Sequence, residues 1–240
     1  YMKILILVAH PDDEIIMCGA TIDKLIKKGH EVFVTFYTQN CQGYFYKETQ
    51  AKRKKRSLIE ANKSSDVLGY KINFLPFHDM EVGKNEGVLL QQTIKEIRKI
   101  NPDVIFTHYS QDKHIDHRTL GRIVPEANFQ SGCAVVGGIT KSRAPLLLQG
   151  EVDLEMTTPF DYSVVSLLTK ENINRKIEAF NFYTSVKDEH SMNQDWIERR
   201  LRSVASIRGA SINGEYGEAF IINNYSPLTP KALKIASEIM

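Results

Sequence analysis

The sequence predicts a doubly wound α/β fold, in which a mostly parallel, Rossmann-like sheet is flanked by helices. Two observations favour this fold class. Strand-like and helix-like segments alternate over the first two thirds of the chain, and the first strand is a continuous apolar run, Lys3 to Val8 (KILILV). Alternation of this kind is typical of parallel strands joined by right-handed crossovers. A continuous apolar run is expected of a strand that is buried on both faces.

Four strands are expected in this first part. Each is rich in aliphatic, β-branched or aromatic residues, which strands favour. In chain order they are Lys3 to Val8, Glu31 to Tyr37, Lys71 to Leu75 and Asp103 to Thr107.

Three helices are expected between these strands. Gly29 and Gly69 stop the first two, and Asn101-Pro102 ends the third, since glycine and proline commonly follow a helix. The expected helices are Thr21 to Lys28, about Lys47 to Leu68, and Val88 to Ile100.

The last third is less regular. No repeat, low-complexity stretch or linker divides it from the rest, so residues 1–240 are interpreted as a single domain. Strands are expected at Pro145 to Gln149, Ser163 to Leu168 and Glu218 to Ile222, and helices at Glu171 to Tyr183 and Asp195 to Ile207.

The composition is that of an ordinary globular protein. Of the 240 residues 42% are hydrophobic, and 31 basic against 29 acidic residues leave a net charge of +2. This balance gives no reason to expect a nucleic-acid partner, and the basic run Lys52 to Arg56 is better explained as a solvated helix face than as an RNA- or phosphate-binding patch. No apolar run of membrane-spanning length occurs.

The three cysteines are Cys18, Cys41 and Cys133, and no two of them form a CxxC pair. They are expected to be reduced thiols of a cytoplasmic protein, which argues against a disulfide framework and a thiolate zinc site. No export signal is expected at the N-terminus, because the short apolar run leads directly into charged residues.

A polar motif, His10-Pro11-Asp12-Asp13-Glu14, follows the first strand directly. An imidazole and a carboxylate three residues apart on a tight turn can converge on one metal ion. Of the adjacent Asp12 and Asp13, one can bind the metal while the other acts as a base. The alternative is a polar loop that caps the following helix.

A second polar segment, His108 to His117, follows the fourth strand and precedes a helix expected over Arg118 to Val124. His114 and His117 can supply one metal ligand and one catalytic imidazole, and either Asp112 or Asp116 can accept the other ring N–H of a histidine. Parallel sheets bind ligands at the carboxyl ends of their strands, so both polar segments are predicted to face one crevice. A solvated loop is the alternative.

Together, Ala9 to Glu14 and His114-Ile115-Asp116-His117 resemble the LmbE-like or PIG-L family of zinc-dependent N-acetylglucosamine deacetylases. Further similarities cover most of the chain. They are Glu60 with Leu68-Gly69, Phe77-His78-Asp79, Pro102 to His108, and Gly217-Glu218-Ala219-Phe220.

This resemblance implies a deacetylase of LmbE-like fold, with a role for each matching residue. The metal ligands would be His10, Asp13 and His117. Asp12 would be the general base, and His114, paired with Asp116, the second catalytic group. Asp79 and an arginine of the second helix, Arg56, would contact the sugar, although the family arginine usually stands where this chain has Ser57.

The implied reaction uses Zn²⁺, and Fe²⁺ is also compatible with two histidines and one aspartate. A zinc-activated water would lose a proton to Asp12 and attack the acetyl carbon, and protonated His114 would stabilise the oxyanion. The implied partner is a small amino-sugar substrate, and a homo-oligomer is compatible with the sequence.

Two other interpretations remain open at this point. One keeps the metal site and changes the substrate to a non-sugar or antibiotic-type amide. The other is a non-catalytic carbohydrate-binding homologue, which would need neither Asp12 nor His114. The sequence does not name the group attached to the sugar or the residue that protonates the leaving amine.

Overall fold

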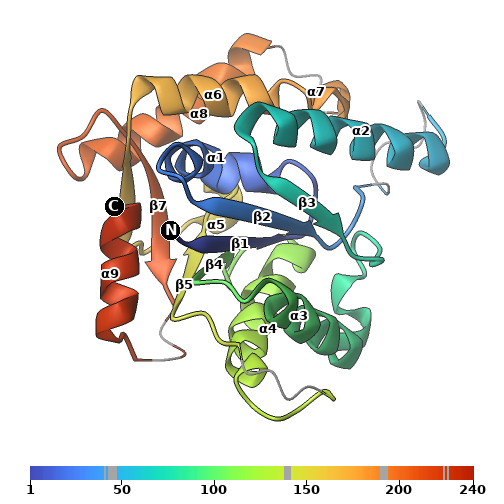
Figure 1. Cartoon of the computed structure of the whole chain (residues 1–240). Coiled ribbons are helices and arrows are strands. Elements are labelled where there is room, and N and C mark those ends of the chain that lie inside the picture. Colours follow the sequence, from blue (N-terminus) through green and yellow to red (C-terminus); the bar gives the residue numbers. More distant parts are fainter. Residues whose placement is uncertain (41, 43–47, 138–141, 190–193, 224, 226) are drawn as a thin grey trace.

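The computed structural model describes residues 1–40, 42, 48–137, 142–189, 194–223, 225 and 227–240. In these residues one seven-stranded sheet has the order β3-β2-β1-β4-β5-β7-β6 (Figure 1). The strands are β1 (Lys3–Val8), β2 (Glu31–Phe36), β3 (Lys71–Phe74), β4 (Val104–His108), β5 (Leu146–Gly150), β6 (Val164–Leu168) and β7 (Tyr216–Ile222).

The sheet is mostly parallel, which confirms the predicted fold class. Strands β3, β2, β1, β4 and β5 pair in parallel, and β7 lies antiparallel between β5 and β6. Strand β1 is central, and its side chains alternate between two cores: Ile4 and Ile6 contribute to one, and Leu5 and Leu7 to the other. Burial on both faces therefore explains why the run carries no polar residue after Lys3.

Helices cover both faces of the sheet (Figure 1). One face packs against α1 (Asp13–Lys27), α2 (Gln50–Leu68), α6 (Lys170–Phe180), α8 (Gln194–Ala210) and α9 (Pro230–Ile239), and the other against α3 (Glu86–Ile100) and α4 (Ile115–Ser131). Shorter helices are η1 (Val82–Asn85), α5 (Leu154–Thr157) and α7 (Thr184–Glu189).

Three differences from the expected elements stand out. Helix α1 begins at Asp13 rather than Thr21, so the polar motif runs directly into it. Helix α2 begins at Gln50, and Lys47, where it was expected to start, lies outside the described residues. Helix α9 was not expected, although Thr229 caps it and Pro230 occupies its first turn, an arrangement that helix starts favour.

Helix α1 is kinked at Cys18, whose backbone angles (φ −148°, ψ 21°) are not helical. The backbone groups that the kink frees find partners elsewhere. The Glu218 carboxylate accepts hydrogen bonds from the N–H groups of Ala20 (3.1 Å) and Thr21 (2.8 Å), and Lys176 Nζ donates to the carbonyl of Ile16 (2.7 Å). Since Lys176 also pairs with Glu218 at 2.7 Å, one buried ion pair caps both halves of the helix.

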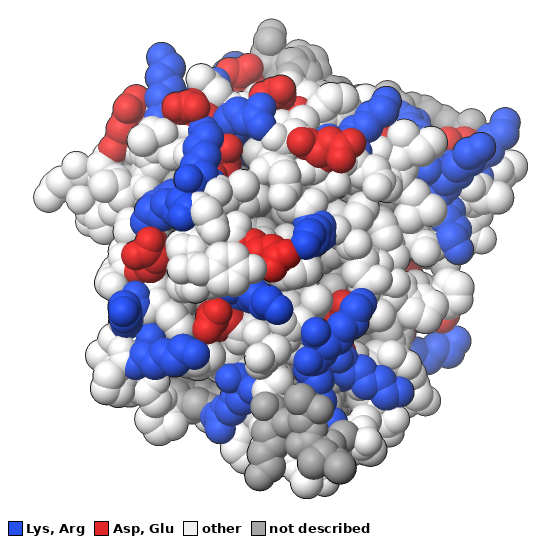
Figure 2. Space-filling view, in the orientation of Figure 1, with Lys and Arg blue, Asp and Glu red and all other residues white. Residues whose placement is uncertain are grey.

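Basic and acidic side chains are interspersed over the face shown in Figure 2. In the run from Lys52 to Arg56 the lysines are exposed, whereas Arg53 is buried and Arg56 is half-buried. Among the described residues, no helix is both long and apolar enough to span a membrane.

Candidate metal centre and active site

The turn after β1 carries the first polar motif. Asp13 begins α1, and its Oδ2 accepts a hydrogen bond from the backbone N–H of His10 at 2.8 Å, which closes the turn. Asp12 has φ 119°, in a region that residues other than glycine rarely adopt. Its side chain makes no capping hydrogen bond to α1, so the capping alternative does not account for it. Strained residues of this kind concentrate at functional sites.

The loop after β4 carries the second segment. His114 is the N-cap of α4 and accepts a hydrogen bond from the backbone N–H of Asp116 at its Nδ1 (3.2 Å), and His117 follows in the first turn. Asp112 Oδ1 accepts from the backbone N–H of His114 at 2.7 Å. Gly121 of α4 lets this loop lie close, since a Cβ there would be 2.6 Å from Cα of Ser110.

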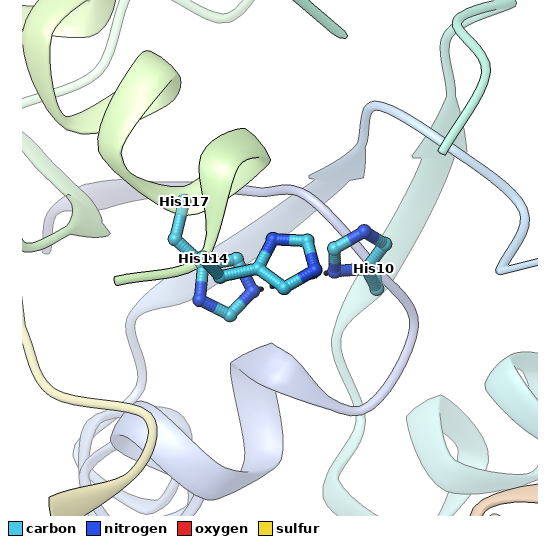
Figure 3. Close-up of side chains that lie close together, drawn as sticks. All are labelled: His10, His114 and His117. Atoms are coloured by element: carbon cyan, nitrogen blue, oxygen red, sulfur yellow. Dashed lines mark hydrogen bonds between the residues drawn. The ribbon is translucent and has the colours of Figure 1, made fainter. Parts of the chain in front are cut away.

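The two segments meet at the carboxyl ends of β1 and β4, which are neighbours in the sheet. Figure 3 shows the rings of His10, His114 and His117 gathered in one place. The ring centroids of His10 and His114 are 4.9 Å apart, and those of His114 and His117 are 4.5 Å apart. The shared crevice expected from parallel strand order is therefore present.

Three side chains offer ligand atoms with the spacing of a metal site. His10 Nδ1 lies 3.3 Å from His117 Nε2 and 3.3 Å from Asp13 Oδ2, and His117 Nε2 lies 3.3 Å from Asp13 Oδ1. Two ligands at the usual zinc bond lengths in a tetrahedral site lie about 3.4 Å apart. Asp13 meets the two imidazoles with different carboxylate oxygens, and the donor types and their spacing fit a divalent metal.

Each metal-facing imidazole is oriented by a carboxylate. His117 Nδ1 lies 3.2 Å from Asp112 Oδ2, and His10 Nε2 lies 3.2 Å from Asp116 Oδ2. An N–H donated to each carboxylate leaves the other ring nitrogen with a lone pair toward the metal position. The predicted pairing of Asp116 with His114 is wrong for the carboxylate, because only the backbone N–H of Asp116 reaches His114.

The charges of the cluster favour a cation between these groups. Burial would raise the pKa of Asp13, but His117, His108 and His10 outweigh it and hold that pKa well below its usual value. Burial would likewise lower the pKa of His10 and of His117, but the neighbouring carboxylates outweigh it and raise both. A metal and a proton compete for the same lone pairs, so metal binding here releases protons.

Two other trios also place ligand atoms within 4.8 Å of one another, His10 with His114 and His117, and Asp13 with His108 and His117. His108 ring Nε2 accepts a hydrogen bond from the backbone N–H of Ala9 at 2.9 Å, so that lone pair is already used. The ring stacks on His117 at 4.1 Å, and burial lowers the pKa of His108 to about 4. We therefore assign His108 a supporting position behind His117 and not a metal ligand.

The structure lowers the pKa of His114 to about 4, through burial and the nearby His117 and His10. Since Nδ1 accepts a hydrogen bond from Asp116, the proton of the neutral ring lies on Nε2. The sequence-based expectation of a protonated His114 is therefore not supported, and the ring is better described as a neutral N–H donor.

A cavity of about 490 Å³ opens beside the cluster. Its wall includes His10, Asp12, Asp13, His114 and His117 together with Asp79, whose Oδ2 accepts from the backbone N–H of Gln42 at 2.6 Å. Arg56 does not line it.

Arg56 instead lies against Glu60 (3.0 Å) and the hydroxyl of Thr184 (2.7 Å). Buried Glu60 also accepts hydrogen bonds from the hydroxyl and the backbone N–H of Ser185 at 2.5 and 3.0 Å. Arg56 thus joins α2 to α7, and the structure does not bring this predicted sugar contact to the cavity.

Sequence reasoning missed the surroundings of Glu14. Its buried carboxylate accepts hydrogen bonds from the hydroxyls of Tyr70 (2.8 Å) and Tyr183 (2.6 Å) and from the backbone N–H of Asp12 (3.0 Å). Burial raises the pKa of Glu14 to about 7. This network holds the strained turn from behind, and no spacing in the sequence joins three residues so far apart.

The model of the PIG-L family, described as GlcNAc-PI de-N-acetylase, matches residues 5–128, which include both polar segments. The chain belongs to this family. The match confirms the resemblance that the two motifs indicate, and places the metal-facing residues inside the part of the chain that defines the family.

One relative is similar to this chain in sequence, and one solved structure shares its fold. The probable N-acetyl-alpha-D-glucosaminyl L-malate deacetylase 2 of Bacillus cereus is 27% identical over 212 residues, which cover 81% of this chain and 94% of that protein. The N,N'-diacetylchitobiose deacetylase structure from Pyrococcus horikoshii superposes with a TM-score of 0.80 at 24% identity, over 95% of this chain and 86% of that one.

The same fold also occurs with another named activity. The 4-carboxy-2-hydroxymuconate hydratase GalB of Pseudomonas putida KT2440 superposes with a TM-score of 0.75 at 18% identity, over 92% of this chain and 96% of that one. A likeness at this identity shows the fold alone, so the reaction has to be argued from the site.

Proposed function

We propose that the protein is a metal-dependent hydrolase that removes the N-acetyl group from an N-acetylglucosamine-type sugar, giving acetate and a free amine. The observation that carries the proposal is the mutual contact of His10, Asp13 and His117, in which each imidazole nitrogen lies 3.3 Å from the other and from one oxygen of the Asp13 carboxylate, beside Asp12 in one cavity. Membership of the family and the names of the deacetylase relatives support the same reaction.

We propose Zn²⁺ as the metal, because two imidazoles and one carboxylate are ligands that catalytic zinc sites use, and Fe²⁺ as the alternative that accepts the same set. When bound, such a metal supplies Lewis acidity, which lowers the pKa of water and polarises the amide carbonyl.

The side chains of the chain supply the proton transfers. Asp12 accepts the proton of the attacking water, since its carboxylate lines the cavity and does not cap α1. Neutral His114 donates its Nε2–H to the oxyanion that develops on the amide, where a fixed donor stabilises the transition state. Asp12, which then holds the proton taken from the water, gives it to the leaving amine, and Asp79 binds a sugar hydroxyl.

The remaining features of the proposal concern the whole chain. One sheet runs through both halves of the sequence, which supports a single catalytic domain over residues 1–240. Cys18 and Cys133 are free thiols, which fits a reducing compartment, and we propose that the enzyme acts in the cytoplasm.

The test combines metal content with turnover. Purified wild-type protein is expected to hold one metal per chain by mass spectrometry and to release amine from an N-acetyl amino sugar, measured by fluorescamine labelling. His10→Ala should lose the metal. Asp12→Asn should keep the metal and lose at least about 10²-fold in kcat, the usual contribution of a general base.

Asn tolerates the positive φ of position 12, so this variant tests the carboxylate and not the backbone. Full activity in Asp12→Asn would exclude it as the base. If only non-sugar amides are turned over, the protein is an amidase with a different substrate class. If the protein has neither metal nor turnover, the interpretation as a non-catalytic carbohydrate-binding homologue is favoured.

A further inference from the structure

The cavity extends well beyond the groups that handle the amide. Its volume of about 490 Å³ lies within the range of sites that enclose whole small molecules, roughly 300–1,000 Å³. An acetyl group adds a single methyl to the amide carbonyl, so much of this space is left for another part of the substrate.

The two sides of the cavity differ in chemistry. Asn40, Gln42 and Asp79 lie in the wall formed by the segments after β2 and β3, and offer polar groups. The wall formed by α1, α6 and α8 is apolar. It consists mainly of Met17, Phe180, Ile197, Leu201, Val204 and Ala205.

Each basic side chain of the apolar wall is paired with an acidic one, and the first such pair is Arg200 with Asp153. Lys176 lies 2.7 Å from Glu218, and both are about 4% exposed. Arg208 makes two hydrogen bonds of 2.6 Å to Glu151. These pairs leave the wall without a net charge for a polar ligand, and its open surface is aliphatic and aromatic.

An amide carries one substituent on nitrogen and one on carbon. In the proposed function the nitrogen substituent is a sugar, whose hydroxyls require polar partners, and the polar wall supplies them. The carbon substituent then leaves the reacting centre toward the apolar wall. Resting on that proposed function, we propose that the apolar wall is an acyl chamber and that the preferred substrate is an N-acyl amino sugar with a chain longer than acetyl.

The expected size of the preference follows from burial of the chain. Each methylene buried in an apolar site contributes a factor of about four, equivalent to about 0.8 kcal/mol. Two further carbons should therefore raise kcat/KM by about 15-fold, and the gain should continue until the chamber is full.

The experiment compares N-acetyl-, N-butanoyl-, N-hexanoyl- and N-octanoylglucosamine as substrates, with amine release as the readout. The chamber predicts that kcat/KM for hexanoyl exceeds that for acetyl by at least tenfold in the wild type. Ala205→Leu, which fills the chamber from α8, should reduce this ratio to near one. Ser206→Leu, which introduces the same side chain at the exposed neighbouring position, should leave both rates unchanged.

A second variant changes the chamber in the opposite direction. Leu201→Ala enlarges it and should shift the optimum toward the octanoyl substrate. Leu201→Ala keeps the proposal testable if Ala205→Leu fails to fold, because only a folded enzyme can show a shift in its preferred chain length.

Binding gives a readout that is independent of turnover. Asp12→Asn protein titrated calorimetrically with N-octanoyl- and N-acetylglucosamine should bind the octanoyl compound at least tenfold more tightly, and adding Ala205→Leu should remove the difference. Turnover of the acetyl substrate with no gain for longer chains would overturn the chamber and leave the deacetylase proposal intact. Chain-selective binding without turnover of any member would support the chamber and overturn the reaction.

Discussion

At the scale of single residues, four aspartates of one cluster have four different surroundings. Asp13 faces the metal position, Asp12 lies on a strained turn, and Asp112 and Asp116 each hold one imidazole. The carboxylates behind the imidazoles fix which ring nitrogen carries the proton, and therefore which one can bind a metal. A change in either should act on metal affinity and only indirectly on the reaction.

We expect Asp112→Asn to weaken metal binding by about 10–100-fold, because the side chain no longer enforces the tautomer that presents Nε2 of His117. Competition between the protein and a chromophoric chelator for Zn²⁺ measures this directly. Asp66→Asn, the same change at an exposed position of α2, should bind as the wild type does. Equal affinity in the two variants would contradict the role of Asp112.

A second residue-scale prediction concerns pH and lies far from the metal site. His30 Nδ1 accepts a hydrogen bond from the backbone N–H of Met2 at 3.2 Å, and burial lowers the pKa of His30. The neutral ring is thus favoured in the folded chain, and below about pH 6.5 the unfolded chain binds more protons at this position. Its stabilising effect is full above pH 6.5 and is lost as the pH falls toward the lowered value.

Urea unfolding at pH 7.5 and pH 5.5 tests this sign. The free energy of unfolding should fall more steeply between the two values in the wild type than in His30→Gln, which shares every other titrating group. A wild type and variant that lose the same amount would show that His30 contributes nothing to the pH dependence.

At the scale of elements, the strands of the parallel part and their crossover helices could be predicted because their patterns are local. Helix α1 is the exception. Its first turns read as an unbroken apolar run from Ile15 to Ala20, since that stretch is largely buried, and no polar face marks the helix. The orientation of β7 was also beyond local patterns, because it depends on pairing with β5 and β6.

The site likewise divides into features that local sequence patterns predict and features that depend on residues distant in the chain. Parallel strand order predicted that the two polar segments meet, whereas side-chain directions could not be predicted, and the assignment of His10, Asp13 and His117 as metal ligands, which the family resemblance implied, stays a prediction. Asp116 turns toward His10 because the backbone N–H groups of Met80 and Val82 hold its carboxylate at 2.7 and 3.3 Å. That loop is remote in sequence, so local patterns could not show that the Asp116 carboxylate meets His10 and not His114, the partner that the family resemblance implied.

The kink of α1 gives a prediction at this scale. Lys176→Met should lower the free energy of unfolding by about 3–5 kcal/mol, because Glu218 is then left buried without its cation. Adding Glu218→Gln should recover part of the loss, since the amide removes the stranded charge and its oxygen can still accept from α1. Denaturant titration of the single and double variants measures both effects.

The exposed pair Arg122 and Glu86 provides the control, because Arg122→Met breaks an ion pair of similar length, 2.8 Å, in solvent. This control variant should lose much less free energy of unfolding than Lys176→Met does. Should the double variant be less stable than Lys176→Met alone, the gain from removing the stranded charge would be disproved.

At the scale of the whole molecule, the cluster joins segments that are about a hundred residues apart. His10 and Asp13 follow β1 and His117 follows β4, so Asp12, Asp13, Asp112 and Asp116 gather at one edge of the sheet, where the neighbouring histidines lower the pKa of Asp13. The near-neutral total of +2 therefore hides a local excess of carboxylates at one edge of the sheet. A metal bound there should stabilise the fold as well as supply the chemistry.

Removing the metal should lower the melting temperature of the wild type. A metal present at about 1,000 times its Kd stabilises the folded state by about 4 kcal/mol, which for a chain of this size is a shift of roughly 10 °C. Differential scanning calorimetry before and after chelation measures the shift, and added Zn²⁺ should restore it. His10→Ala, which lacks a ligand, should melt at one temperature with or without chelator, and a chelator effect of wild-type size in that variant would place the stabilising metal elsewhere in the molecule.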